Sequence, residues 1–210
     1  LGNKKFPVVY VVEKYLLILD QKKNLNNYVI LFKKGDVKLP KNYRPIAIIP
    51  VLSKLFSGVL LKRLQPLLES LQSEEQNGFR PGYSCNDEIH LLRIIAEKKE
   101  EWGEEVWLAS LDLEKAFDKV LHSSVFEGLT EAGADPRIIH VLRRLYAQQQ
   151  AYVQIDGCGK SSFFLILREV RQGDPLSPLL FNNVTRLIFN ELKDKWQKLG
   201  YGIAIGADAS

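Results

Sequence analysis

The stretch that decides the fold is residues 106–118, which read Val-Trp-Leu-Ala-Ser-Leu-Asp-Leu-Glu-Lys-Ala-Phe-Asp. Residues 106–113 are nearly all apolar, as in a strand that is buried on both faces, and they predict a central strand. Asp112 stands at the carboxyl end of this strand, where active-site groups concentrate, and Asp118 follows just past the turn. A carboxylate on an apolar strand is costly unless a cation meets it, so Asp112 is a candidate ligand of a hard cation such as Mg²⁺. The alternative is that Asp112 only caps the turn.

On both sides of this stretch, short extended runs alternate with helical patterns. Strands are predicted at 28–32, 46–49, 152–155, 162–167 and 201–205. Helices are predicted at 51–64, 84–102, 123–132, 136–147 and 174–192. Pro66 should end or kink the first helix, Ser84 and Asp87 form a capping box for the second, and Asp174 caps the last. Gly157-Cys158-Gly159 reads as a hairpin turn. The fold class is mixed α/β (α+β), and residues 1–27 receive no role.

The composition fits a soluble globular chain. The 210 residues are 46% hydrophobic and 26% charged, which excludes a disordered, collagen-like or coiled-coil protein. The two cysteines have no metal-ligand spacing, and no apolar run approaches the roughly 18 residues of a membrane span. We therefore expect an intracellular protein without membrane contact. The chain contains no methionine, so we expect it to be part of a longer reading frame.

The charge is divided unevenly along the chain. Residues 1–63 hold 13 basic and 3 acidic side chains, a balance of +10, whereas residues 64–210 have a balance of −6. A basic first third beside an acidic remainder suits a protein that holds a polyanion and divalent cations. Solvated surface lysines are the equally simple alternative.

Three further motifs carry candidate binding residues. In the turn 171–178, Gly173 lets the backbone approach a ligand and Gln172 can donate and accept hydrogen bonds, although Asp174-Pro175 alone would make a good helix start. The basic residues around the first predicted hairpin could grip a triphosphate or a nucleic-acid backbone, or be plain surface charges. They are Lys33, Lys34, Arg44 and Lys54. Phe79 and Arg80, in the turn 76–82, could stack on bases or simply pack a corner.

In order, these motifs resemble the reverse transcriptase domain of non-LTR (LINE-type) retrotransposons, with a weaker likeness to group II intron enzymes. The resemblance covers residues 28–205 and rests on FKKGD…NYRPI, QNGFRPG, LDLEKAFD and RQGDPLSPLLF. It implies a right-hand polymerase with fingers at 28–104 and an incomplete palm at 105–210. It also implies an RNA template, a DNA primer, deoxynucleoside triphosphates and a nuclear site of action. Oligomeric state is left open.

The resemblance implies a role for each matched residue. Asp112, with the backbone carbonyl of Leu113, would hold Mg²⁺ in a two-metal site for nucleotidyl transfer to a primer 3′-hydroxyl. Phe117 would be the steric gate that rejects a ribose 2′-hydroxyl. Gln172 and Gly173 would line the nucleotide and template pocket. Arg44 and Lys54 would contact the triphosphate, while Lys33, Lys34, Phe79 and Arg80 are weaker candidates for nucleic-acid contact.

The sequence departs from the family pattern in two places. The second catalytic motif, an aromatic-Ala-Asp-Asp, is absent from the 210 residues, where Ala207-Asp208-Ala209 holds a lone aspartate. We therefore expect the chain by itself not to polymerise. Glu169 replaces a residue that is often Gly in the family, which could disturb the turn that follows. A non-catalytic RNA-binding remnant and a decayed element without activity are the competing interpretations.

Overall fold

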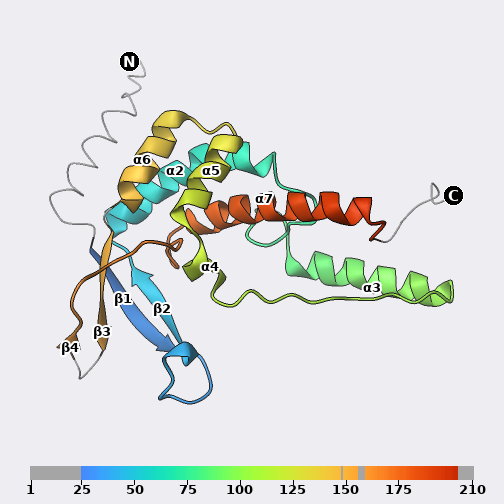
Figure 1. The fold of residues 1–210 in the computed structure, drawn as a ribbon, viewed down its shortest axis with the longest axis horizontal. Helices are drawn as coiled ribbons and strands as arrows, with labels where there is room; N and C mark the ends of the chain where they lie inside the picture. Colours follow the sequence, from blue (N-terminus) through green and yellow to red (C-terminus); the bar gives the residue numbers. More distant parts are fainter. Residues whose placement is uncertain (1–24, 148, 156–158, 203–210) are drawn as a thin grey trace.

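The computed structural model describes residues 25–147, 149–155 and 159–202. It confirms a mixed α/β fold in which a group of packed helices stands above a small twisted sheet (Figure 1). Of residues 1–27, to which the sequence assigned no role, residues 1–24 lie outside the described residues and residues 25–27 belong to the first strand.

The sheet is built around β1 (Leu25–Phe32). It pairs with β2 (Tyr43–Ile48) in antiparallel register, with Tyr28 opposite Ala47, and with β3 (Gln150–Ile155) in parallel. The strand order is β2-β1-β3-β4, where β4 is Gly159–Lys160, and β5 (Phe164–Leu165) also pairs with β3. The strand predicted at 162–167 is thus confirmed only at Phe164–Leu165. Of the turn predicted at 157–159, residues 157 and 158 lie outside the described residues. Since parallel strands need a long crossover, the helices between β2 and β3 supply it.

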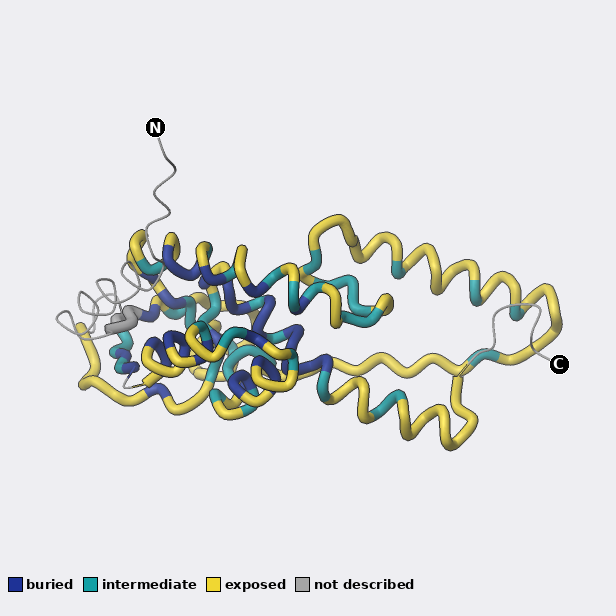
Figure 2. The backbone as a smooth tube through the Cα atoms, turned by 90° about the horizontal axis from the view of Figure 1, so that it is seen from above, coloured by how far each residue is buried: buried dark blue, intermediate teal, exposed yellow. Residues whose placement is uncertain are grey.

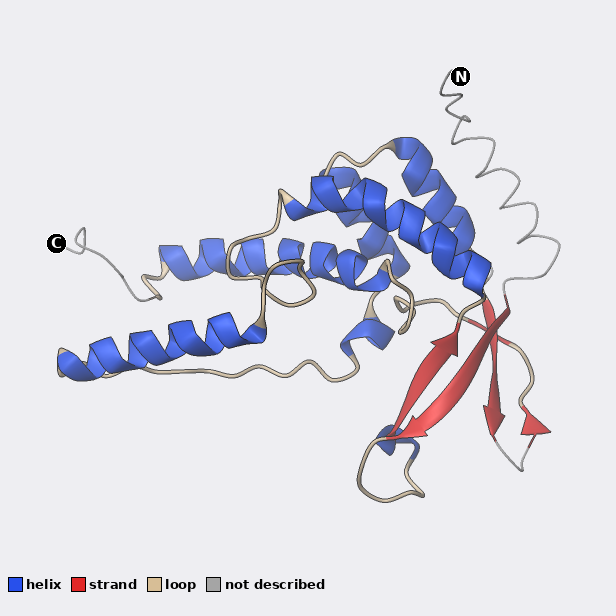
Figure 3. Ribbon diagram, turned by 180° about the vertical axis from the view of Figure 1, so that it is seen from behind, coloured by secondary structure: helices blue, strands red, loops and turns tan. Residues whose placement is uncertain are grey.

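Four helices make the main core, and Figure 3 shows the helices grouped at one end of the sheet. They are α2 (Val51–Glu69), α5 (His122–Glu131), α6 (Pro136–Tyr146) and α7 (Ser177–Lys198). Leucines spaced one turn or more apart are fully buried between them, at positions 64, 68, 129, 142 and 180. Each buried leucine contributes about 1.5–3 kcal/mol, which makes this helix cluster the main source of stability.

Two helices, α2 and α7, differ most from their predicted ranges, and α7 also continues past its predicted end at residue 192 to Lys198. Pro66 does not end α2, which continues to Glu69 and buries Leu68 completely. The loss of about 3 kcal/mol for an interior proline is offset by the burial of Leu64 and Leu68 on the same face. Asp174 is not the cap of α7, because this helix begins at Ser177. The Asp174 carboxylate instead accepts hydrogen bonds from the Leu176 amide (3.0 Å) and the Ser57 hydroxyl (3.1 Å).

The prediction of a buried central strand at 106–113 is wrong. These residues are in no helix or strand, and Trp107 is 88% and Leu111 80% exposed. A strand needs a partner for its backbone hydrogen bonds, and no other part of the described chain pairs with this segment. Within the described ranges, its apolar side chains are therefore not covered by another element.

The helix before this segment, α3 (Cys85–Glu101), is formed as predicted with its capping box, in which the Ser84 amide donates to the Asp87 carboxylate at 3.0 Å. None of its residues is buried. Figure 2 shows α3 and the segment after it as exposed arms that extend from the helix cluster. The local signals thus specify the helix, but its expected apolar face has no partner in the described part of the chain.

The remaining elements are short. They are a 3-10 turn, η1 (Pro40–Asn42), and α4 (Ala116–Lys119). Tyr201 and Gly202 are not in a strand, and the rest of the strand predicted at 201–205 lies outside the described residues. Within the described ranges, every helix is too short or too polar to cross a bilayer.

Candidate active site

The structure brings three distant parts of the sequence together around one cleft of about 450 Å³. One wall is the loop between β1 and β2, the second is the segment 112–118, and the third is the turn before α7. The cleft is lined by Lys33, Lys34, Lys41, Asn42, Tyr43, Arg44, Asp112, Leu113, Glu114, Lys115, Ala116, Phe117, Asp118 and Gln172. Most of the candidate residues named from the sequence therefore meet in one place.

The first wall is cationic and its shape is set by a tight loop. The Lys33 amide donates to the Asn42 carbonyl at 2.9 Å, which closes the loop at the end of the β1–β2 hairpin. Gly35 has a φ of +95°, which favours glycine, and a Cβ there would lie 2.7 Å from the side-chain nitrogen of Asn42. The loop presents Lys33, Lys34 and the neighbouring Arg44 to the cleft, where they can attract phosphate groups.

The second wall carries carboxylates. Asp112, Glu114 and Asp118 all line the cleft, together with the backbone of Leu113. Burial raises the pKa of Asp118, and the nearby Lys115 ammonium opposes this effect. Asp112 is exposed, because the segment that carries it is not in a sheet.

The donors of this wall are all oxygens, which suits a hard divalent cation. Asp112 and the carbonyl of Leu113 are adjacent donors on the same wall of the cleft. In the part of the chain that the structure describes, no three acidic, His or Cys side chains are grouped closely enough to hold a metal ion. The chemistry of these oxygen donors is compatible with a divalent cation, but the described residues do not form a complete site for one.

Phe117 lines the cleft with a ring that is fixed by two other rings. It stacks on Phe181 of α7 (centroids 4.8 Å apart, planes at 11°) and meets the edge of Phe79 at 5.8 Å. Offset and edge contacts of this kind stabilise aromatic pairs. The ring is thus a rigid part of the wall directly after the carboxylates.

The third wall is the turn that holds Gln172. Its backbone carbonyl accepts a hydrogen bond from the Ala47 amide of β2 at 3.3 Å, so the turn is docked on the free edge of the sheet. Gly173 has a φ of +105°, and a Cβ there would be 3.3 Å from the Ala47 carbonyl oxygen. The positive φ and the close approach to β2 both favour glycine here, whereas the predicted approach of Gly173 to a ligand stays a prediction.

Four predicted residues lie outside the cleft lining, and one of them is Gly173, which packs on β2. Lys54 is exposed on α2, and Phe79 meets the cleft only through its contact with Phe117. The Arg80 side chain is 8% exposed, and its guanidinium pairs with Glu69 at 2.5 Å. The Arg80 guanidinium also donates to the carbonyls of Ser73 and Gln76, both at 2.9 Å. Its contacts therefore stabilise the loop that follows α2.

Sequence reasoning missed Lys41 and Lys115, and it gave no role to Asp118. Lys41 follows the loop proline directly and precedes Asn42, so its place inside the predicted basic loop was a usable signal. Lys115 adopts a φ of +52° at the start of α4, which no residue pattern announces.

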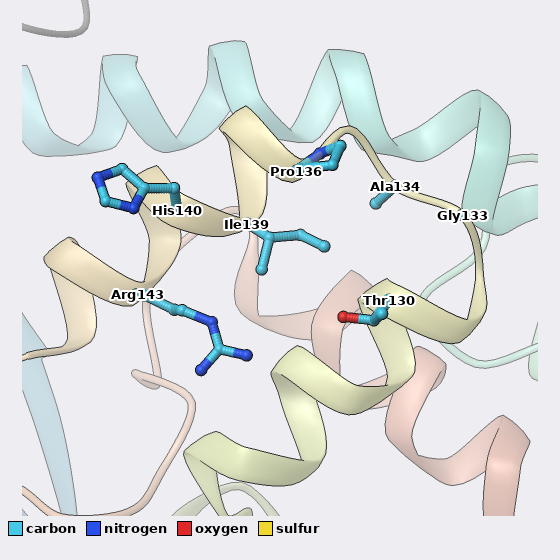
Figure 4. Close-up of a pocket in the computed structure, with 7 residues that line it drawn as sticks. All are labelled: Thr130, Gly133, Ala134, Pro136, Ile139, His140 and Arg143. Atoms are coloured by element: carbon cyan, nitrogen blue, oxygen red, sulfur yellow. The ribbon is translucent and has the colours of Figure 1, made fainter.

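A second hollow of about 520 Å³ lies between α5 and α6 (Figure 4). Figure 4 shows Thr130 of α5 and Arg143 of α6 on its two sides. The Arg143 guanidinium lies 4.5 Å from the centre of the Phe126 ring, and the Thr130 hydroxyl donates to the Phe126 carbonyl. None of the motif residues lines this hollow, so the smaller, charged cleft is the better candidate for chemistry.

Comparison with known proteins matches residues 31–206 to the family described as reverse transcriptase (RNA-dependent DNA polymerase). The retrovirus-related Pol polyprotein from the type-2 retrotransposable element R2DM of Drosophila melanogaster is 31% identical over 74% of the chain. That from the type-1 element R2 of Popillia japonica is 32% identical over 72%, and the RNA-directed DNA polymerase from the mobile element jockey of Drosophila funebris is 27% identical over 75%. The chain spans 14%, 21% and 17% of these three relatives, respectively.

Proposed function

The chain belongs to the reverse transcriptase (RNA-dependent DNA polymerase) family, and we propose that its charged cleft is the deoxynucleotide site of an RNA-directed DNA polymerase domain. One observation carries the proposal. Basic side chains of the β1–β2 loop face the carboxylates of 112–118 and Gln172 across a single cleft, although they are far apart in the sequence. The family acts on a nucleic-acid template with nucleotides and generally uses a divalent metal ion.

In this proposal, each wall has its own task. Lys33, Lys34 and Arg44 hold the triphosphate through charge-assisted hydrogen bonds. Asp112 and the Leu113 carbonyl hold Mg²⁺, which supplies charge neutralisation at the phosphates when bound. Gln172 positions the nucleotide against the template.

Phe117 selects the sugar. Its ring lines the cleft and is held by Phe79 and Phe181, so it cannot swing away from a bulkier ribose. A fixed apolar ring rejects a 2′-hydroxyl by clash and offers it no hydrogen bond. The proposed substrate is therefore a deoxynucleoside triphosphate.

The proposal also divides the domain, with residues 28–104 as mainly fingers and 105–210 as mainly palm. The β1–β2 loop of the first part supplies the cationic wall, and the second part supplies the carboxylates and Gln172. An RNA template and a DNA primer would lie across both parts.

The test is equilibrium binding of dATP to the 210-residue chain in the presence of Mg²⁺. Arg44→Ala should weaken binding by roughly 10- to 150-fold, since it removes a charge-assisted hydrogen bond of about 1.5–3 kcal/mol. Asp112→Asn should also weaken binding, since it removes the negative charge of a proposed Mg²⁺ ligand. Arg93→Ala is the matched control, because Arg93 is exposed on α3 and pairs only with Glu97 among the ion pairs found. An affinity that neither variant changes would reject the assignment of the cleft.

A second candidate function is RNA binding without catalysis, favoured by the four basic side chains that the cleft wall gathers, Lys33, Lys34, Lys41 and Arg44. Affinity for RNA that falls steeply with salt, without any selective affinity for dATP, would support this alternative. Selective dATP binding with the variant effects above would support the polymerase site instead.

A further inference from the structure

Glu169 adopts a backbone conformation that favours glycine. Its φ is +110°, and it lies three residues before Gln172, the residue that lines the cleft. A side chain at such a φ is strained and persists only when its surroundings hold it there.

The backbone around Glu169 is tied to the segment that leads out of α4. The Glu169 amide donates to the Val120 carbonyl at 2.8 Å, and the Val170 amide donates to the Phe117 carbonyl at 3.0 Å. A ring nitrogen of His122 lies 3.1 Å from the Glu169 carbonyl oxygen. These contacts fix the backbone, but they do not use the carboxylate.

The carboxylate is held by a residue of the sheet. The Tyr28 hydroxyl of β1 donates a hydrogen bond to Glu169, across 141 positions of sequence. Tyr28 is only 5% exposed, so its ring is a fixed part of the small core under the sheet. The hydrogen bond therefore connects the turn to a rigid point.

The residue that faces Tyr28 across the sheet binds the turn at Gln172. Tyr28 is the cross-strand neighbour of Ala47, and the Ala47 amide donates to the Gln172 carbonyl at 3.3 Å. The facing residues Tyr28 and Ala47 thus each form a hydrogen bond to the turn, at position 169 and at position 172 respectively. Loss of either contact would remove one of the hydrogen bonds that hold the turn on the sheet.

We propose that Tyr28 and Glu169 form a latch that fixes the 169–173 turn on the free edge of β2 and thereby sets the position of Gln172 in the cleft. The inference rests on the proposed function in one respect, namely that Gln172 faces the nucleotide. Glu169 and Tyr28 are positioning residues, because they act through Gln172.

The charges around the latch agree with this role. Burial raises the pKa of Glu169, and the hydrogen bond from Tyr28 opposes this effect. The negative charge of Asp118 also raises this pKa, and the positive charge of Arg171 lowers it. Tyr28, Asp118, Arg168 and Glu169 line a hollow of about 390 Å³ beneath the turn. Without the Tyr28 hydroxyl, the half-buried carboxylate would lose its hydrogen bond beside a second carboxylate.

The test is amide hydrogen exchange at Ala47 in the full 210-residue chain, measured by NMR. Tyr28→Phe and Glu169→Ala should each speed exchange at Ala47 by about fivefold, the effect of one lost hydrogen bond, and the double variant should exchange no faster than either. Glu169→Gln should restore slow exchange, because its amide oxygen can still accept from Tyr28. Tyr152→Phe on the neighbouring strand β3 is the matched control, and the Ser161 amide, bound to Val153 at 2.9 Å, is the internal reference.

The outcomes separate the latch from the proposed function. Equal exchange at Ala47 in the wild type, Tyr28→Phe and Glu169→Ala would overturn the latch; should Glu169→Ala fail to fold, Tyr28→Phe decides alone because it keeps the ring. Faster exchange with unchanged dATP affinity would overturn the claim that the latch positions Gln172. A wild-type chain that binds no dATP would overturn the proposed function, and the latch would still be decided by exchange at Ala47.

Discussion

Phe117 shows how a single side chain can belong to the protein interior and to a cleft at once. One side of its ring is covered by Phe79 and Phe181, and the ring also lines the cleft. The family resemblance pointed to this residue from the sequence, whereas its two ring contacts come from α7 and from the turn 76–82.

We predict that Phe117→Ala reduces the preference of the chain for dATP over ATP by about tenfold, since removal of the ring ends the clash with the 2′-hydroxyl. Competition binding of the two nucleotides measures the ratio. Phe163→Ala is the control, because that ring is exposed and contacts Tyr152 away from the cleft. An unchanged ratio in Phe117→Ala would contradict the steric role.

Asp118 provides a prediction about pH. Burial raises its pKa, so the folded chain binds this proton more tightly than the unfolded chain does. Such a group favours folding below the ordinary carboxyl pKa, and this contribution is lost as pH rises through the folded-state pKa. Asp118→Asn, which is uncharged at every pH, should therefore unfold at a higher temperature than the wild type at about pH 7, and the difference should vanish near about pH 3.

Circular dichroism during heating at both pH values tests this expectation. Asp194→Asn removes an equivalent but exposed carboxyl on α7 and should change the unfolding temperature little at either pH. A gain for Asp118→Asn that is larger at the acidic pH would have the wrong sign for a carboxyl with a raised pKa.

At the scale of elements, the same apolar composition has opposite outcomes in α2 and in residues 106–113. Leu60, Leu64 and Leu68 of α2 are buried in the core that α2 shares with α5, α6 and α7, even with Pro66 inside the helix. The apolar residues 106–113 meet no partner strand in the described part of the chain and stay exposed. Hydrophobic residues thus stabilise an element only where another element is available to cover them.

We predict that Leu64→Ala lowers the free energy of unfolding by about 2–5 kcal/mol, because Leu64 is 1% exposed in the helix core. Trp107→Ala, which removes a larger side chain, should change it by less than about 0.5 kcal/mol because the indole is 88% exposed. Urea unfolding of the two variants and the wild type measures both values. A loss of several kcal/mol in Trp107→Ala would show that the indole is buried in solution.

At the scale of the whole molecule, the uneven charge becomes a spatial feature. The β1–β2 loop belongs to the basic first third of the chain, and the carboxylates of 112–118 belong to the acidic remainder. The fold places the basic loop and these carboxylates in the lining of the same cleft. A polyanion and a divalent cation can therefore be held in the same place.

This arrangement predicts the salt dependence of RNA binding. If the cationic wall contacts phosphates, Lys34→Ala should weaken binding of unstructured single-stranded RNA and reduce the slope of log K against log salt by about 0.7. Filter binding over roughly 50–200 mM salt measures the slope. Arg93→Ala on α3 should leave it unchanged, and equal slopes in the wild type and Lys34→Ala would exclude this residue from the phosphate contacts.

The sequence by itself determined the local elements and the family. Caps, turn glycines and apolar spacing act over a few residues, so β1, β2, α3, α5 and α6 were predictable from their own segments. The four ordered motifs also identified Asp112, Phe117, Arg44 and Gln172 as residues to be placed together, and all four line the cleft.

Only the tertiary structure decided which apolar segments are buried and which polar residues meet. Burial of α2 beyond Pro66, exposure of residues 106–113 and the internal use of Arg80 depend on neighbours from distant parts of the chain. The Tyr28–Glu169 contact, across 141 positions, has no local signal at all. The physical reason is that hydrogen bonding within a turn is local, whereas desolvation and strand pairing depend on what the fold brings alongside.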